Sequence, residues 1–164
     1  MVGSASAEMR HYYVDRIVEF EEGVRAVGVK SVSLSEDVFD DHFPGNPVFP
    51  GVLLLEGLAQ TGGMLLAKTY HGERLAVMVS IERARFRSFA RPGDSVRMEV
   101  EIENTHDDFA RVLGTATVGA RQVAAARFSF KLVHPSSVIP PTYRDFWEQT
   151  RSTWFGEYLD IDGE

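Results

Sequence analysis

The sequence contains no cysteine, which excludes disulfide bonds, thiol nucleophiles and cysteine-ligated metals. It also lacks any run of about 18 consecutive apolar residues, so we expect no membrane-spanning helix. Basic residues are in deficit: 17 lysines and arginines face 24 acidic residues, for a formal net charge of -7. Binding to nucleic acid, which normally requires a basic domain or stripe, is therefore not expected. Any catalytic chemistry has to use His, Asp, Glu, Ser or Tyr.

The beginning of the chain is small and polar, without a basic segment followed by an apolar one. We therefore expect residues 1–9 to form a flexible tail rather than a signal peptide, and the protein to be cytoplasmic. The 164 residues, of which 44% are hydrophobic and 25% charged, are suited to one globular domain.

One stretch of the chain combines a rigid loop with a long apolar run. Residues 41–51 contain three prolines and two glycines, and prolines fix φ and lack a backbone donor, so neither a helix nor a regular strand is expected there. From Val52 to about Tyr70 the residues are apolar on nearly every side, which predicts a helix of about 28 Å that is surrounded by protein. Gly57, Gly62 and Gly63 would each cost this helix about 1 kcal/mol relative to alanine. They indicate close packing against a sheet or a second helix, or clearance for a bound chain.

Strand-like segments lie on both sides of the predicted helix. Residues 11–20 and 24–34 are rich in β-branched and aromatic residues and predict a hairpin, followed by an acidic turn or short helical piece at 35–41. After the helix, four strand-like runs are separated by turn sequences at hairpin spacing, which predicts an antiparallel meander. These runs are 75–89, 95–104, 110–118 and 122–133. The order of elements indicates an α+β fold with the sheet wrapped around the helix.

The end of the chain differs in composition. Residues 135–141 predict an extended linker, and Thr142 with Asp145 predicts a helix cap. The helix that follows would present Tyr143, Phe146, Trp147 and Trp154 on one face. We expect this face to pack on the protein's own sheet, and a partner or lid contact is the alternative. The chain thus divides into a tail (1–9), a main domain (10–133) and a helical extension (134–164).

His42 and Glu56 are the two residues of the central stretch best suited to transferring protons near neutral pH. A carboxyl group on an otherwise apolar helix retains its proton more readily and could act as an acid. Each residue also has a structural interpretation: His42 as a hydrogen-bonded loop histidine, and Glu56 as a carboxylate held by the backbone or Gln60. Composition alone leaves both interpretations of Glu56 open.

The stretch from His42 to Gln60 strongly resembles the signature of 3-hydroxyacyl-[acyl-carrier-protein] dehydratases of hot-dog fold, of the FabZ-like type that carries Glu on its central helix. Shorter similarities lie at 14–16, 84–87 and 91–94. The resemblance implies dehydration of (3R)-3-hydroxyacyl thioesters of acyl carrier protein to trans-2-enoyl thioesters. A hot-dog thioesterase and a non-catalytic acyl-binding or scaffold subunit are the alternatives.

The resemblance also implies roles for individual residues. His42 would remove the C2 proton, and Glu56 would protonate the departing hydroxyl group. The backbone N–H of Gly51, at the start of the helix, would stabilise the negative charge on the thioester oxygen. The carbonyl of Val48 would orient the imidazole, and Gln60 would lie beside these groups.

A homodimer with shared sites is implied as well, with His42 from one chain and Glu56 from the other, and with a higher oligomer possible. Gly57, Ala59 and Gly63 would allow the two helices to approach. We expect no metal and no cofactor, because phosphopantetheine of an acidic carrier protein holds the substrate. Four arginines form the best local basic patch for that carrier, three of them alternating at strand period and so sharing a face. They are Arg83, Arg85, Arg87 and, just beyond, Arg91.

Overall fold

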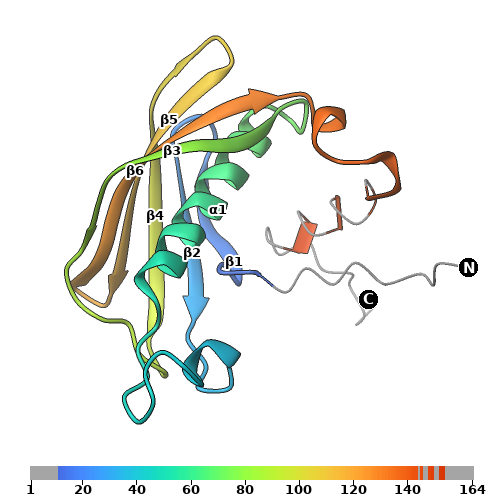
Figure 1. Ribbon diagram of the computed structural model, residues 1–164. Helices are drawn as coiled ribbons and strands as arrows, with labels where there is room; N and C mark the ends of the chain where they lie inside the picture. Colours follow the sequence, from blue (N-terminus) through green and yellow to red (C-terminus); the bar gives the residue numbers. More distant parts are fainter. Residues whose placement is uncertain (1–10, 144, 146–147, 150–151, 154–164) are drawn as a thin grey trace, which may run out of the picture.

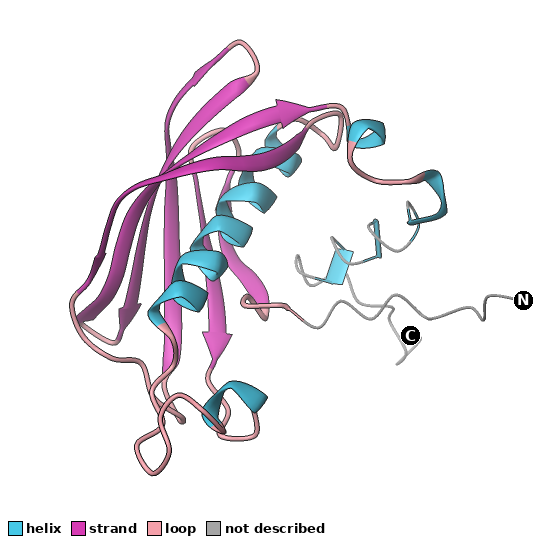
Figure 2. Cartoon of the chain, in the orientation of Figure 1, coloured by secondary structure: helices cyan, strands magenta, loops and turns pink. Residues whose placement is uncertain are grey.

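The computed structural model describes residues 11–143, 145, 148–149 and 152–153 of the chain. Six antiparallel strands form one sheet that curves around a long helix, α1 (Figure 1 and Figure 2). The helix spans Gly51–Thr69, one residue earlier at each end than we expected. The strands are β1 (Arg16–Glu21), β2 (Arg25–Ser31), β3 (Leu75–Phe86), β4 (Ser95–His106), β5 (Phe109–Val118) and β6 (Arg121–Val133). The predicted α+β architecture is confirmed.

The strands follow one another across the sheet in the order β1-β2-β4-β5-β6-β3. The predicted first hairpin is confirmed, although residues 11–15 precede β1 instead of belonging to it. The acidic segment after it contains a short 3-10 helix, η1 (Asp37–Phe39). β4, β5 and β6 form the predicted meander. The meander prediction is wrong for β3, which pairs with β6 at the edge of the sheet and not with β4.

The segment 87–94 therefore crosses from β3 to β4, which are separated in the sheet by β5 and β6. Its turn chemistry is as predicted, because the N–H of Asp94 donates to the carbonyl of Arg91 over 3.0 Å. The turn then joins the end of β2, where the N–H of Gly93 donates to the carbonyl of Val32. A tight turn constrains only its own residues, so its composition did not reveal which strand the chain meets next.

The helix α1 packs one side against the concave face of the sheet. Its fully buried leucines Leu54, Leu58, Leu65 and Leu66 meet inward side chains of the strands, including Met98, Val112 and Phe128. The opposite face is open within one chain: Val52 is 66% exposed, and Glu56, Gln60 and Gly63 are half-buried. Within one chain the sheet covers only one side of the helix, so the expectation that the helix is surrounded is confirmed for that side alone.

Two of the helix glycines leave room for side chains of the sheet to pack against the helix backbone. A Cβ atom at Gly57 would lie 2.5 Å from Sδ of Met98, and one at Gly62 would lie 3.3 Å from Cγ1 of Val112. Ala59 belongs to the core as well. A role for Gly57 and Ala59 in contact with a second helix is therefore wrong, since both are used inside the chain. At Gly63 a Cβ atom would meet nothing within 4 Å.

The segment after β6 is more helical than we predicted. Pro135–Ser137 and Pro141–Tyr143 are 3-10 helices, η2 and η3, where we expected an extended linker and a helix cap. Residues 145, 148, 149, 152 and 153 are helical, whereas Phe146, Trp147 and Trp154 lie outside the described residues. In the part of the chain that the structure describes, no helix is both long and apolar enough to span a membrane.

Candidate active site

The loop before α1 is held in a compact shape by its own backbone. The N–H of Val48 donates to the carbonyl of His42 over 3.0 Å, and the N–H of Asn46 donates to the carbonyl of Phe43 over 2.9 Å. Gly45 occupies the turn between them with φ of +73°, a conformation that favours glycine. These contacts fix His42 at the mouth of the loop, as the proline-rich sequence predicted.

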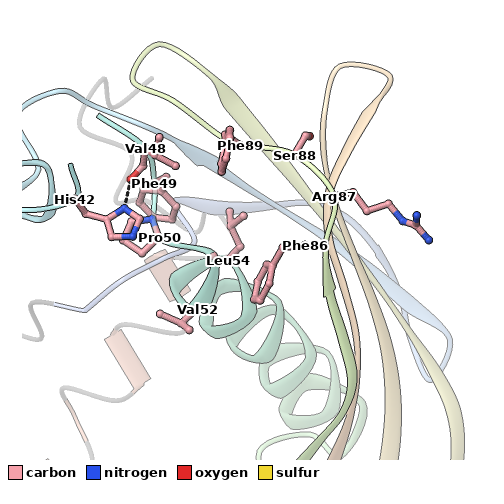
Figure 3. Close-up of a pocket in the computed structure, with 11 residues that line it drawn as sticks. His42, Val48, Phe49, Pro50, Val52, Leu54, Phe86, Arg87, Ser88 and Phe89 are labelled. Carbon is pink, nitrogen blue, oxygen red and sulfur yellow. Dashed lines mark hydrogen bonds between the residues drawn. The ribbon is translucent and has the colours of Figure 1, made fainter. Parts of the chain in front are cut away.

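The imidazole of His42 is oriented by a backbone carbonyl. Its Nδ1 lies 2.7 Å from the carbonyl oxygen of Val48, as the dashed line in Figure 3 marks. A carbonyl oxygen can only accept, so Nδ1 carries a proton, and in the neutral imidazole Nε2 keeps the lone pair. This tautomer can accept a proton through Nε2, and the ring of Phe43 stacks on the imidazole with centroids 4.1 Å apart.

The helix begins directly beside this histidine. Pro50 is the N-cap residue and makes no side-chain cap hydrogen bond, so the first N–H groups of α1 have no acceptor within the helix. The absence of a side chain at Gly51 leaves room for the ring of Phe86, because a Cβ atom there would lie 2.7 Å from its Cδ1. Backbone donors and the positive end of the helix dipole thus lie next to His42.

A cavity of about 400 Å³ connects the loop, the helix start and the end of β3. It is mostly apolar, and Figure 3 shows side chains from all three segments around it, with Arg87 pointing away from His42. The described residues that line it are His42, Val48, Phe49, Pro50, Gly51, Val52, Leu54, Phe86, Arg87, Ser88 and Phe89. Glu56 is not among these described residues, so one chain does not bring the two predicted proton-transfer groups into the same cavity.

Glu56 is held on the open face of α1 by Gln60. The amide Nε2 of Gln60 donates to Oε1 of Glu56 over 3.0 Å and to the carbonyl of His11 over 2.8 Å. Its Oε1 accepts the N–H of Tyr13 over 3.0 Å. Sequence reasoning placed Gln60 near Glu56 but missed Tyr13 and His11, which lie 47 and 49 residues before Gln60 in the chain.

The electrostatics of this region are visible at Tyr13. Burial raises the pKa of the Tyr13 hydroxyl, the negative charges of Glu56 and Glu36 raise it further, and the positive charge of Lys30 opposes them. The hydroxyl therefore stays protonated around neutral pH. Two carboxylates and one ammonium group lie close enough to Tyr13 to influence it.

The predicted basic patch differs from a regular strand face. Arg83 has φ of +54°, and the pairing with β6 shifts register between Glu82 and Arg85, so the strict alternation we expected is wrong. Arg87 lies one residue beyond β3, and Arg83, Arg85 and Arg87 are all exposed. Arg91 is held by the loop instead: its Nη1 donates to Oδ1 of Asn46 over 2.8 Å.

The phenylalanines of the cavity wall were also missed as functional residues. Phe86 is 53% exposed and Phe89 is 61% exposed, unusually large fractions for aromatic side chains. The signal that could have identified Phe86 was its place in the segment 84–87. Across the part of the chain that the structure describes, no cluster of three or more His, Asp or Glu side chains could hold a metal ion.

Comparison with known proteins found related sequences and similar folds. A family model described as a FabA-like domain matches residues 7–127. The chain is 45% identical over 124 residues to the 3-hydroxyacyl-[acyl-carrier-protein] dehydratase FabZ of Chloroflexus aggregans, covering 75% of this chain and 86% of that protein. It is 42% identical over 125 residues to the corresponding FabZ of Thermomicrobium roseum, covering 76% and 84%. A hot-dog-like protein from Thermanaerovibrio acidaminovorans has the same fold, with a TM-score of 0.60, 20% identity and coverage of 79% and 93%.

Proposed function

Because the chain belongs to the FabA-like domain family, we propose that it dehydrates (3R)-3-hydroxyacyl thioesters of acyl carrier protein to trans-2-enoyl thioesters. The relatives that share 42% and 45% of its residues are named as dehydratases of this type, and the chain covers most of their length. The observation that carries the proposal is the hydrogen bond between Nδ1 of His42 and the carbonyl of Val48. It directs a basic Nε2 toward an apolar cavity beside a helix N-terminus.

The reaction begins at C2 of the substrate. Nε2 of His42 accepts the C2 proton, and the electron pair of the broken C–H bond moves toward the thioester carbonyl. The negative charge that grows on the carbonyl oxygen is stabilised by the N–H of Gly51 and by the positive end of the helix dipole. Neither the imidazole of His42 nor the N–H group of Gly51 has to move during this step, because the loop and the start of the helix hold them in place.

The reaction ends at C3. In its protonated form, the carboxyl group of Glu56 donates a proton to the C3 hydroxyl group, the C–O bond breaks, and water leaves as the C2–C3 double bond forms. Gln60 orients the Glu56 side chain through the 3.0 Å hydrogen bond. The steps use side chains and backbone donors only, so we infer no bound cofactor, and phosphopantetheine of the carrier holds the acyl chain.

Each site is shared by two chains, with His42 from one and Glu56 from the other. Two observations support a dimer. β3 is an edge strand, and its inward side chains Met78, Ile81 and Phe86 are 39%, 41% and 53% exposed. Exposed apolar side chains on an unpaired edge are rare on a monomer. The open face of α1, with Glu56 and Gly63, is the second surface that a partner chain would cover.

The acidic carrier protein docks on the exposed arginines around the cavity. Arg87 lines the cavity, and Arg83 and Arg85 precede it on the same edge. Their positive charges would steer an acidic partner toward the cavity opening. Arg91 has a different main role, since it ties Asn46 to the crossover.

The test is a dehydration assay on 3-hydroxyacyl carrier protein that follows the absorbance of the conjugated enoyl thioester. The wild-type protein should form the enoyl product, and His42→Ala and Glu56→Gln should each lower kcat by at least about a hundredfold. His106→Ala and Glu73→Gln, which change exposed residues of the same types, serve as matched controls. Release of free thiol without enoyl product would indicate a thioesterase, and the absence of either product would contradict the enzymatic function.

A further inference from the structure

Lys30 is the only charged residue that is buried in the described part of the chain, with 8% of its surface exposed. Its Nζ lies 3.2 Å from Oε1 of Glu36 and 3.6 Å from Oδ1 of Asp15, and it donates to the carbonyl of Ser31 over 3.1 Å. A buried ammonium group is stable only when it is paired and hydrogen-bonded. Lys30 therefore joins three segments that approach it from different directions.

The first connection leads from Lys30 to His42. Glu36 is the N-cap residue of η1, and its Oε1 also accepts the N–H of Ser33 over 3.0 Å. Within η1, the carbonyl of Val38 accepts the N–H of His42 over 3.1 Å. The position of Glu36 against Lys30 thus determines where η1 holds the backbone of the histidine.

The second connection leads from Lys30 to Glu56. Asp15 is fixed on β2, because its Oδ2 accepts the N–H of Ser31 over 2.7 Å and its own N–H donates to Val29 over 2.7 Å. Two residues earlier, the N–H of Tyr13 donates to Gln60, whose amide holds the carboxylate of Glu56. Asp15 thus anchors the segment that orients Gln60.

We propose that Lys30 is a positioning residue for both proton-transfer groups, holding the His42 loop through Glu36 and the Glu56 side chain through Asp15. This inference rests on the proposed function. Since His42 and Glu56 of one chain serve two different sites of the dimer, Lys30 of each chain supports both sites. The influence of Glu36, Glu56 and Lys30 on the pKa of Tyr13 agrees with their proximity.

The first test is Lys30→Met, which keeps the length of the side chain and removes its charge. Without the cation, the carboxylates of Asp15 and Glu36 repel each other and both connections loosen. We expect kcat to fall about tenfold with KM within about twofold, because misplaced groups affect the chemical step more than substrate binding. Lys30→Arg should restore most of the lost kcat. Lys131→Met, which removes an exposed charge from β6, should match the wild type and is the control.

The second test does not depend on activity. The imidazole signal of His42 is identified in NMR spectra by its absence in His42→Ala. It should move in Lys30→Met and in Glu36→Gln but not in Asp15→Asn, and the signal of the exposed His106 should stay constant in all three. If Lys30→Met does not fold, Glu36→Gln and Asp15→Asn keep the side-chain shapes and decide the question.

A folded Lys30→Met protein with unchanged kcat and an unchanged His42 signal would overturn the proposal. A loss of activity that equals the loss of folded protein in melting curves, without a shift of the His42 signal, would overturn it too. Failure of the proposed function is distinguishable from both outcomes. In that case the wild-type protein forms no enoyl product, while the His42 signal still reports whether Lys30 positions the loop.

Discussion

The side-chain amide of Gln60 is suited to its place because it donates and accepts at the same time. It donates to Glu56 and His11 and accepts from Tyr13, so it fixes one carboxylate to a segment that lies far away in the sequence. A carboxylate or an apolar side chain at this position could satisfy only part of this arrangement.

Replacement of Gln60 by leucine should therefore lower kcat without abolishing folding. The substitution removes the donor to Glu56 and leaves the N–H of Tyr13 without its acceptor, at a cost of about 1 to 3 kcal/mol of stability. We expect kcat to fall about tenfold, as part of the contribution of a general acid is lost. Dehydration kinetics and denaturant unfolding measure both effects. Gln122→Leu is the matched control, and equal kcat values for the two variants would contradict the orienting role of Gln60.

Glu19 gives a residue-level prediction about pH. Hydrogen bonds from Arg97 and Arg25 hold the pKa of the Glu19 carboxyl below its ordinary value. A carboxyl whose pKa is lower in the folded state contributes stability above its unfolded pKa and loses it as the pH falls through the folded pKa. Glu19→Gln should thus lower the melting temperature at pH 7, and the difference from wild type should shrink as the pH falls from about 5 to about 2. A difference between Glu19→Gln and wild type that stays constant over this pH range would refute the prediction.

At the scale of elements, α1 shows how glycines in one helix serve different surfaces. Gly57 and Gly62 allow the helix to approach the sheet, whereas Gly63 lies on the open face. The cost of glycine in a helix, about 1 kcal/mol each relative to alanine, is therefore offset within the described chain only at Gly57 and Gly62. At the first two positions the offset is core packing within the chain. At Gly63 the described chain offers no neighbour that requires it.

Alanine substitutions at Gly57 and Gly63 should consequently have opposite effects on stability. At Gly57 the added methyl group would lie 2.6 Å from Cε of Met98 and 2.8 Å from the carbonyl of Tyr13. Overpacking of about 1 to 3 kcal/mol exceeds the gain in helix propensity, so we expect a net loss of about 1 kcal/mol. At Gly63 we expect a gain of up to about 1 kcal/mol. Urea unfolding of both variants measures the difference, and a destabilised Gly63→Ala protein with a weaker dimer would indicate that a partner helix lies there.

The edge strand β3 leaves part of the apolar surface of a single chain uncovered. Its inward side chains meet the cavity at Phe86 and remain exposed along the rest of the strand. One chain therefore has an exposed apolar surface beside a cavity whose described lining does not include Glu56. Pairing of two copies would cover that surface and complete the cavity.

A mixture of inactive variants tests the shared site. His42→Ala and Glu56→Gln chains should each be inactive alone, but a dimer that contains one of each has one intact pair of His42 and Glu56. When the chains are unfolded together and refolded at equal concentrations, about a quarter of wild-type activity should return, because half of the dimers are mixed and each has one site. The dehydration assay measures it. Mixing without refolding is the control, and a refolded mixture that stays inactive would show that each chain carries its own complete site.

The sequence by itself determined the local structure of the protein. Prolines and the glycine at position 45 specified the rigid loop, and the apolar run after Pro50 specified α1, because both depend on backbone preferences of neighbouring residues. Alternating residues and turn sequences predicted every strand, with ends that differ from the observed ones by up to five residues. The segment from His42 to Glu56 also carried the chemical hypothesis, since the residue types suited to proton transfer lie within it.

Only the tertiary structure decided how these pieces meet. It placed β3 beside β6, used Gly57 for Met98 instead of a second helix, and separated Glu56 from the cavity that holds His42. It also brought Tyr13 to Gln60 and gathered two carboxylates around Lys30. The physical reason is that these contacts join residues that are not neighbours in the sequence, most of them tens of positions apart. Their geometry follows from burial and packing of the whole chain, and local propensity carries no information about it.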